Sequence, residues 1–464
     1  MNSYWNENYK GKDFPKLNKN IEVDVCVIGG GIAGINTAYY LAGRGLKVAV
    51  LEKNKLCSST TGGSTGKITS QHGLIYKYLK DLNGKEYATK YYKANEEAKE
   101  NIIKIINKEK IDCDLEYKNA YVYTEVEKMV QDIKEEIEYT KKLDIKSDFT
   151  TKLDLPLDIY GAIKFENQAQ FDPVKYTYGL ADAIIKNDGE IYENSKVIDT
   201  VEDDGKYNVI TKEGKVRAKY LVITTRYPII NFPGYYFMKM YQSTSYAIIV
   251  DTHTEINYDG FYINAETPVF SFRTVKSGDK NLLLAVGYDY KTGTEIVGNP
   301  FEYLKAKVKK MYPEAEVLKS WTAEDAISLD KIPYIGNFSD IMDNCYVATG
   351  FNKWGITSAN IAAKIITDKI FENSNEYEDI FESSRLGIIK NKEEMMNMIK
   401  EAGEGIILER IKGKPTPTCT HLGCKLSWNP LEEVWECSCH GSKFSKRGVV
   451  IEGPANKNLD DWNS

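Results

Sequence analysis

The chain has 464 residues, 28% of them charged, and a formal net charge of −6. This length allows two or three domains with a substantial core. The mild acidity gives no electrostatic reason to expect nucleic acid or an anionic membrane surface as a partner.

The first 20 residues, which we interpret as an N-terminal extension, are polar, and no apolar run is long enough to cross a bilayer. Only four of the eight cysteines lie in the first 418 residues, where they are scattered. That usage is typical of free thiols in a reducing compartment rather than of a disulfide framework. We therefore expect a cytosolic protein without a membrane span.

A strand, a glycine-rich turn, a helix and a second strand follow one another after this extension. Residues 22–28, EVDVCVI, alternate and then become wholly apolar, as a buried parallel strand does. Gly29, Gly31 and Gly34 then form the G-x-G-x-x-G spacing, INTAYYLAGRG has a helical pattern, and the strand KVAVLEKN carries Glu52 near its end. This order predicts the first unit of a dinucleotide-binding domain.

The residue types suit a pyrophosphate and a ribose. Gly29 allows the tight turn, Gly31 lets the backbone approach the phosphates, and Gly34 lets helix and strand pack closely. The helix N-terminus supplies unpaired N–H groups, and Glu52 is placed to accept from ribose hydroxyls. A structural glycine turn is the alternative, but it does not explain all the parts in sequence.

Residues 57–76, CSSTTGGSTGKITSQHGLIY, are rich in Ser, Thr and Gly, which predicts an irregular loop. Here the chain resembles the D-amino-acid-oxidase-like family of FAD-dependent oxidoreductases. In that family such a segment runs over the pyrophosphate and past the flavin ring. The resemblance implies FAD as the cofactor, with Thr61 and Lys67 at its site.

Two later stretches extend the resemblance. Residues 171–200 have the pattern of a helix and then a strand, and the family places the backbone at Val197 against the adenine. Residues 215–225, KVRAKYLVITT, are similar to the strand that returns to the nucleotide, which places Thr225 near it.

The closing flavin-contact region of the family is similar to SLDKIPYIG (328–336) and NCYVATGFNKWGITSANIAAKII (344–366). The resemblance implies that Gly350, Gly355 and Ile356 lie at the start of a helix whose N-terminus faces the flavin's pyrimidine carbonyl.

The middle of the chain predicts a second layer. SYAIIVDT, GFYINAE, PVFSFRTV and NLLLAVGYDY alternate in polarity and suit the antiparallel substrate-side sheet of this family, and residues 84–110 and 124–143 have helical spacing. We therefore expect an α/β fold with an α+β second layer: a Rossmann-like FAD-binding domain and an antiparallel-sheet substrate domain. These occupy residues 21–375, with FAD-binding segments at about 21–80, 171–230 and 325–372.

The tail concentrates metal-ligand residues. Two of the chain's four histidines and four of its cysteines lie between Cys419 and His440. The pattern is Cys419-x-His421, fifteen residues, then Cys437-x-x-His440. Zinc is one interpretation, since two Cys and two His make a tetrahedral set. However, each half here holds one Cys and one His, whereas zinc fingers pair like with like.

The loops CTHLGC and CSCHGS resemble those of the respiratory Rieske [2Fe–2S] module. The resemblance implies that Cys419 and Cys437 bind one iron, that His421 and His440 bind the other, and that a Cys424–Cys439 disulfide ties the loops together. Such a module is small and all-β. Residues 404–464 would form a shortened version of it, after a helical linker at 376–403.

The two cofactors together predict a function. A flavin takes two electrons at once and a [2Fe–2S] cluster takes one, so their union suggests substrate oxidation followed by single-electron transfer to an external carrier protein or quinone-like molecule. The alternative is an electron-transfer protein or a redox sensor without an amine substrate of its own.

Relatives of residues 21–375, which we call the flavin half, oxidise C–N bonds of amines and amino acids. On that basis Lys67 is a candidate cation beside the flavin N1–C2=O region, Arg273 a candidate clamp for a substrate carboxylate, and Tyr241 a candidate pocket residue. Each has a structural alternative. Lys67 could be a surface lysine and Arg273 a solvent-facing strand residue, and Tyr241 is only one of 33 tyrosines, so the choice of this one is weakly supported. His72 is either a base or a structural hydrogen-bonding residue.

Overall fold

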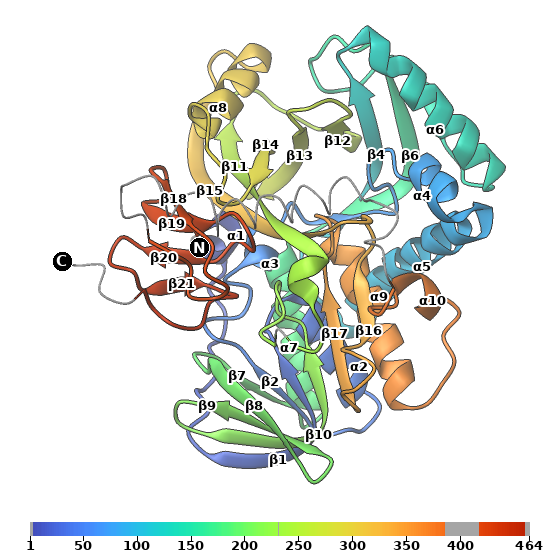
Figure 1. Ribbon diagram of the computed structural model, residues 1–464. Helices are drawn as coiled ribbons and strands as arrows, with labels where there is room; N and C mark the ends of the chain where they lie inside the picture. The colour runs from blue at the N-terminus through green and yellow to red at the C-terminus, as the bar shows by residue number, and fades with distance from the viewer. Residues whose placement is uncertain (1–2, 231, 386–416, 460–464) are drawn as a thin grey trace.

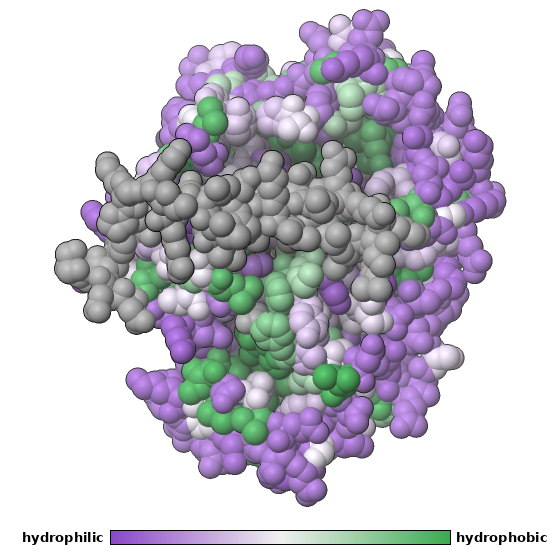
Figure 2. Space-filling model, in the orientation of Figure 1, coloured by the Kyte–Doolittle hydropathy of each residue, from purple (hydrophilic) through white to green (hydrophobic). Residues whose placement is uncertain are grey.

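The computed structural model describes residues 3–230, 232–385 and 417–459. In these residues the chain forms two large sheets and a small one, with helices packed around them (Figure 1). Hydrophilic side chains cover most of the face shown in Figure 2, and hydrophobic ones gather toward its middle. No helix of the described residues is long and apolar enough to cross a membrane.

The first sheet has eight strands and carries the dinucleotide-binding pattern. Its path runs β16-β17-β10-β1-β2-β7, and a β8–β9 pair joins it at β10. β1 pairs in parallel with both β10 and β2, which buries it at the centre as its apolar run predicts. The strands are β1 (Asn20–Ile28), β2 (Val48–Leu51), β7 (Glu190–Tyr192), β8 (Val197–Asp203), β9 (Lys206–Thr211), β10 (Lys215–Ile223), β16 (Tyr334–Asn337) and β17 (Cys345–Thr349).

Three helices pack beside this sheet: α2 (Ile32–Ala42), α7 (Pro173–Lys186) and α9 (Gly355–Ile370). α2 packs against both α7 and α9, so most of its side chains are buried. α7 begins where the Asp172 carboxylate accepts from the N–H groups of Val174 and Lys175, at 2.8 and 3.0 Å. That N-cap and the following proline fix where the helix starts.

The second sheet has nine strands in the order β15-β11-β14-β13-β12-β4-β6-β3, with β5 added at β6. Its pairs are antiparallel except β12–β4, which is parallel. The strands are β3 (Lys67–Ile68), β4 (Glu116–Thr124), β5 (Asp148–Thr150), β6 (Gly161–Gln170), β11 (Met240–Asp251), β12 (Gly260–Asn264), β13 (Phe270–Ser277), β14 (Lys280–Lys291) and β15 (Glu316–Ser328).

Helices also flank this second sheet. α8 packs on β11 and β14, and α6 packs on β6. α5 buries Ile102, Ile105 and Ile106 on the stripe that its spacing predicts, and Ile103 is half-buried. The helices are α4 (Tyr76–Asn83), α5 (Lys85–Glu109), α6 (Val130–Lys142), α8 (Pro300–Met311) and α10 (Glu378–Phe381), with short 3₁₀ turns η1 (Glu127–Met129) and η2 (Tyr236–Met238).

The N-terminal extension is part of the core rather than a loose tail. It holds a short helix, α1 (Tyr4–Asn8), that packs on α3 (Thr60–Gly63). Trp5 is 3% exposed, and its indole N–H donates to the Ser64 carbonyl at 2.8 Å. The extension thereby braces the Ser/Thr/Gly-rich loop.

The C-terminal module, residues 417–459, is a four-stranded antiparallel sheet beside β15 (Figure 1). Its strands are β18 (Leu426–Asn429), β19 (Val434–Cys437), β20 (Lys443–Ser445) and β21 (Val450–Glu452). Of the helical linker predicted at 376–403, α10 lies in the described part, and residues 386–403 lie outside the described residues.

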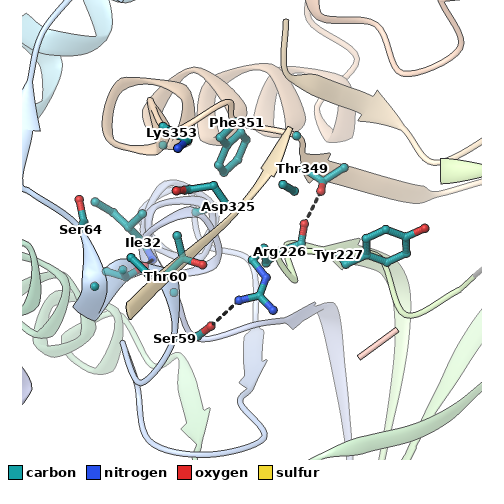
Figure 3. A pocket seen from close by; sticks show the side chains of 18 of the residues that line it. Ile32, Ser59, Thr60, Ser64, Arg226, Tyr227, Asp325, Thr349, Phe351 and Lys353 are labelled. Carbon is teal, nitrogen blue, oxygen red and sulfur yellow. Dashed lines mark hydrogen bonds between the residues drawn. The ribbon is translucent and has the colours of Figure 1, made fainter. Parts of the chain in front are cut away.

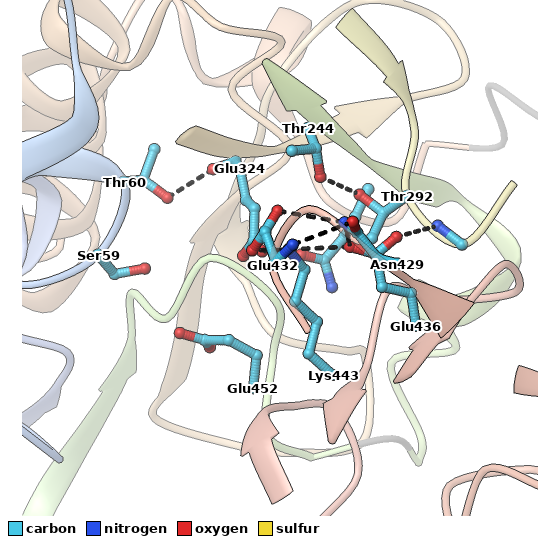
Figure 4. Close-up of polar contacts among 12 residues, drawn as sticks. Ser59, Thr60, Thr244, Thr292, Glu324, Asn429, Glu432, Glu436, Lys443 and Glu452 are labelled. Atoms are coloured by element: carbon cyan, nitrogen blue, oxygen red, sulfur yellow. Dashed lines mark hydrogen bonds and ion pairs between the residues drawn. The ribbon is translucent and has the colours of Figure 1, made fainter. Parts of the chain in front are cut away.

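A buried ion cluster joins this module to the second sheet (Figure 4). The Lys443 ammonium group, 2% exposed, lies 2.5 Å from Glu324 of β15, 2.8 Å from Glu432 and 3.1 Å from Glu436. Arg226 makes a second ion pair with Glu324. Burial alone would raise the pKa of Glu324, but Arg226 and Lys443 outweigh burial and lower it to about 2.

We expect Lys443→Met to lower the free energy of unfolding of the module by about 3–5 kcal/mol, because it leaves buried carboxylates without their cation. Urea unfolding followed by tryptophan fluorescence measures this, since Trp428 and Trp435 stand in the module. Lys446→Met, at an exposed position of the same module, is the control and should shift stability by about 0.5 kcal/mol or less. Equal midpoints for the two variants would contradict the assignment.

Candidate functional site

A cavity of about 680 Å³ runs from the carboxyl ends of β1, β2 and β10 to the second sheet. It is lined by all three of the segments that the sequence assigns to FAD. The predicted cofactor-binding residues that line it are Gly29, Gly31, Glu52, Thr61, Lys67, Val197, Thr225, Gly350, Gly355 and Ile356.

The end of the cavity where the sequence predicts the pyrophosphate is built from the glycine turn and the start of α2. Gly29 has φ +115°, a conformation that favours glycine. A Cβ at Gly34 would lie 1.9 Å from the Gly29 carbonyl oxygen, so only glycine permits this approach of helix to strand. α2 begins after Gly31, and its Ile32 N–H donates to the Thr61 hydroxyl at 3.0 Å. The helix N-terminus therefore faces the cavity with its partial positive charge.

The sequence predicts the adenosine at the ends of β2 and β10 and the start of β8, and we call this part of the cavity the adenosine end. The Glu52 carboxylate accepts from the Gly30 and Asn54 N–H groups at 2.8 and 2.9 Å, and burial raises its pKa. The Thr225 hydroxyl is buried without a hydrogen-bond partner among the described residues. A glycine cradle, an acid at the end of β2 and an orphaned hydroxyl on the cavity wall fit an adenine dinucleotide.

The other end of the cavity holds Lys67, whose side chain is buried. Its ammonium group contacts the Ser271 hydroxyl and lies 5.4 Å from the centre of the Phe261 ring. Burial, and then the charge of Arg273, lower the pKa of Lys67 to about 7. Near neutral pH this lysine can therefore hold or release a proton.

His72 also lines the cavity, but both of its ring nitrogens are engaged. Nδ1 lies 2.7 Å from the Tyr91 hydroxyl and Nε2 lies 2.9 Å from the Thr69 carbonyl. The ring stacks on Trp354 at 4.6 Å, and burial lowers its pKa to about 3. These contacts favour the structural interpretation of His72 over the base.

Three charged residues at the cavity, Lys353, Asp289 and Asp325, are not among the site residues predicted above (Figure 3). Lys353 donates to the Ser245 hydroxyl at 3.0 Å and pairs with Asp289 at 2.9 Å, while Asp325 lines the same wall. Asp289 lies on β14 and Asp325 on β15, and neither belongs to a recognisable motif. The alternation of side chains along a strand was the only feature of the sequence that could have indicated which face of the sheet they occupy.

The structure does not bring Arg273 and Tyr241 to the cavity lining. The Arg273 guanidinium donates to the carbonyls of Gly66 and Phe171 at 3.4 and 3.1 Å and packs on the Trp5 ring. Tyr241 lies beside Lys291, whose ammonium group is 5.9 Å from its ring centre. Arg273 thus holds the loop that carries Lys67. Its guanidinium does not line the cavity, where the sequence predicts that it binds a substrate carboxylate.

The tail residues converge on a second site. Cys424 and Cys439 form a disulfide between the two loops, and their sulfur atoms and that of Cys437 lie within 4.8 Å of one another. The rings of His421 and His440 are 4.9 Å apart and perpendicular. The Cys437 N–H donates to the Ser442 carbonyl at 2.9 Å, which shapes the second loop.

The state of these groups fits a cluster with two thiolate and two imidazole ligands. The hydrogen bond between the two thiols lowers the pKa of Cys419 to about 7 and raises the pKa of Cys437, so the two sulfur atoms lie close together and share a proton that metal binding would displace. Burial lowers the pKa of His421 to about 4 and that of His440 to about 3, so both are neutral at pH 7. The Nδ1 atom of His440 is buried without a hydrogen-bond partner among the described residues, as a ligand atom would be before its metal binds.

The second site adjoins the first. The Tyr227 ring lines the cavity, and its centre lies 6.4 Å from that of His421 and 6.1 Å from that of His440. The His440 Nε2–H donates to the Phe237 carbonyl, which belongs to the flavin half, at 3.2 Å. The two histidines therefore lie on the side of the module that packs against Tyr227, and His440 also contacts Phe237.

Comparison with known proteins agrees with this geometry. A putative Rieske 2Fe–2S iron–sulfur protein, YhfW of Bacillus subtilis (strain 168), is 33% identical over 98% of this chain and 96% of its own length. Gamma-glutamylputrescine oxidoreductase of Escherichia coli (strain K12) is 23% identical over 76% of this chain and 85% of its own. The structure of glycine oxidase from Geobacillus kaustophilus superposes with a TM-score of 0.66 at 18% identity, over 78% of this chain and 99% of that one.

Two family models divide the chain as the two sites do. The model described as FAD dependent oxidoreductase matches residues 24–369, and the model described as Rieske [2Fe-2S] domain matches residues 396–463. These matches confirm FAD and a Rieske [2Fe–2S] cluster as the cofactors that the sequence implies, and they leave the zinc interpretation without support. The chain belongs to the FAD-dependent oxidoreductase family and carries a C-terminal Rieske [2Fe–2S] domain.

Proposed function

We propose that this enzyme oxidises a C–N bond of an amine or amino acid and passes the electrons singly, through the Rieske cluster, to an external acceptor. The observation that carries the proposal is the position of Tyr227 between the dinucleotide cavity and both cluster histidines. The glycine oxidase and gamma-glutamylputrescine oxidoreductase named above support a C–N substrate. The acceptor is a one-electron carrier, either a small protein or a quinone-like molecule.

When bound, FAD supplies a two-electron acceptor for hydride and the cluster supplies a one-electron carrier. The protein binds and orients the substrate and controls its proton. Val122, Ile263 and Val286 give the cavity an apolar wall that excludes water from the reacting carbon.

Lys67 is the residue that we propose for proton transfer. An amine gives up hydride only after its nitrogen has lost a proton. Lys67 has a pKa of about 7, so its neutral amine is available to accept that proton at physiological pH. Burial lowers the pKa of Lys67 most, and the charge of Arg273, which is held behind it on backbone carbonyls, lowers the pKa further.

Tyr227 and His440 are the residues that we propose for electron transfer. The Tyr227 ring is 6% exposed, and burial raises the pKa of its hydroxyl well above the usual value, so the side chain stays a neutral aromatic ring. The contact between His440 and the Phe237 carbonyl holds the ligand side of the module against the flavin half.

An anaerobic panel of amines and amino acids tests the reaction class. We expect at least one compound to bleach the flavin absorbance and then to produce the EPR signal of the reduced cluster. An amine panel that leaves the flavin oxidised, while dithionite still reduces both cofactors, would instead favour an electron-transfer protein or redox sensor.

We expect the rate of flavin reduction at saturating substrate to rise as pH increases through about 7, because Lys67 must be neutral to accept the proton. Lys67→Met should remove this inflection, as rapid-mixing absorbance over pH 5.5–9 would show (a range of about 1.5–2 units on either side of the Lys67 pKa). Lys353→Met, which changes a paired lysine of the same cavity, should keep it. An inflection that persists in Lys67→Met would assign it to another group.

We expect Tyr227→Leu to slow the appearance of the reduced-cluster EPR signal after flavin reduction, while Tyr227→Phe keeps it close to the wild-type rate. The leucine variant loses the aromatic ring between the sites, whereas the phenylalanine variant loses only a hydroxyl that has no hydrogen-bond partner among the described residues. Freeze-quench EPR measures this step separately from substrate oxidation. If the reduced-cluster EPR signal appeared at the same rate in Tyr227→Leu and Tyr227→Phe, the aromatic ring of Tyr227 would not take part in electron transfer.

A further inference from the structure

The dinucleotide cavity is not closed by the flavin half alone. Residues 450–456 of the Rieske module, which comprise β21 and the turn after it, line the same cavity as Gly29 and Gly350. The module therefore supplies a stretch of the cavity wall in addition to its own cluster site.

Charge holds this stretch at the adenosine end. The Glu452 carboxylate lies 2.7 Å from the Lys53 ammonium group and 3.4 Å from the Arg226 guanidinium. Lys53 directly follows Glu52, and Arg226 directly follows Thr225, so both cations stand next to residues at the adenosine end of the cavity. The three side chains are 21%, 32% and 11% exposed, which partly shields the ion pairs from solvent.

The same stretch is connected to the cluster loops. The Ala455 N–H donates to the Ser442 hydroxyl at 3.0 Å, and Ser442 is in the loop of Cys437 and His440. From the flavin half, the Gln242 amide donates to the His440 carbonyl at 2.5 Å and to the Gly453 carbonyl at 3.5 Å. The cluster loop and this part of the cavity wall are therefore joined by hydrogen bonds, both directly and through Gln242.

We propose that residues 450–456 are part of the FAD-binding site, so that the docked Rieske module retains FAD and bound FAD in turn stabilises the docked position of the module. Reciprocity follows from linkage: if the docked module binds FAD more tightly than the undocked one, FAD stabilises docking by the same free energy. The shared element is the turn from Glu452 to Asn456.

Undocking the module from a distance tests the proposal. Lys443 does not line the cavity, yet it anchors the module through Glu324. In the full-length chain we expect Lys443→Met to raise the FAD dissociation constant, measured by flavin fluorescence without substrate, by about 5- to 150-fold, the usual range of coupling between sites. Lys446→Met should bind FAD as the wild type does.

A second measurement uses the unmodified protein and does not depend on how well a variant folds. Saturating FAD should slow amide hydrogen exchange in residues 450–456, apart from Pro454, and leave the exposed β18–β19 turn around Glu433 unchanged. Unaltered exchange at 450–456, or wild-type FAD affinity in a Lys443→Met protein whose module has unfolded, would overturn the proposal. Because no substrate is present, neither result depends on the amine-oxidising function.

Discussion

A buried ammonium group lies at the centre of the contact between the flavin half and the C-terminal module. Lys443 is enclosed by Glu324 of the second sheet and by Glu432 and Glu436 of its own module. Buried charges are tolerated only where partners surround them, so this set of side chains favours a single docked arrangement over loosely tethered alternatives. The positions of the cluster histidines, of Tyr227 and of the 450–456 wall all depend on that arrangement.

Strand β15 lies where the two sites meet. Successive side chains of a strand point to opposite faces, and β15 uses this alternation. Ala323 and Asp325 line the dinucleotide cavity, whereas Glu324 between them pairs with Lys443 and Arg226 (Figures 3 and 4). At this point one strand carries both a part of the cavity wall and the glutamate that pairs with the module.

The charges of the cavity restrict what it binds. Lys67 has a pKa of about 7, Lys353 is paired with Asp289, and Arg273 is occupied by backbone carbonyls. The cavity thus offers no unpaired arginine from β13 to a substrate carboxylate, while Asp325 adds a carboxylate of its own to the wall. Under the proposed amine oxidation, Arg273 is therefore not available to bind a substrate carboxylate.

By itself, the sequence determined the parts whose chemistry is local: the glycine turn with Glu52, and the two loops that bring Cys419, His421, Cys437 and His440 together. In these motifs a fixed spacing specifies the backbone shape, and the family resemblance predicts the ligand set. Tertiary structure alone decided which distant side chains share a site. Arg273 was placed by the side of the sheet it occupies and by the carbonyls of Gly66 and Phe171. In the sequence Lys443 resembles any surface lysine, because its enclosure by Glu324 of β15 and by Glu432 and Glu436 of the β18–β19 hairpin is a property of the packed chain.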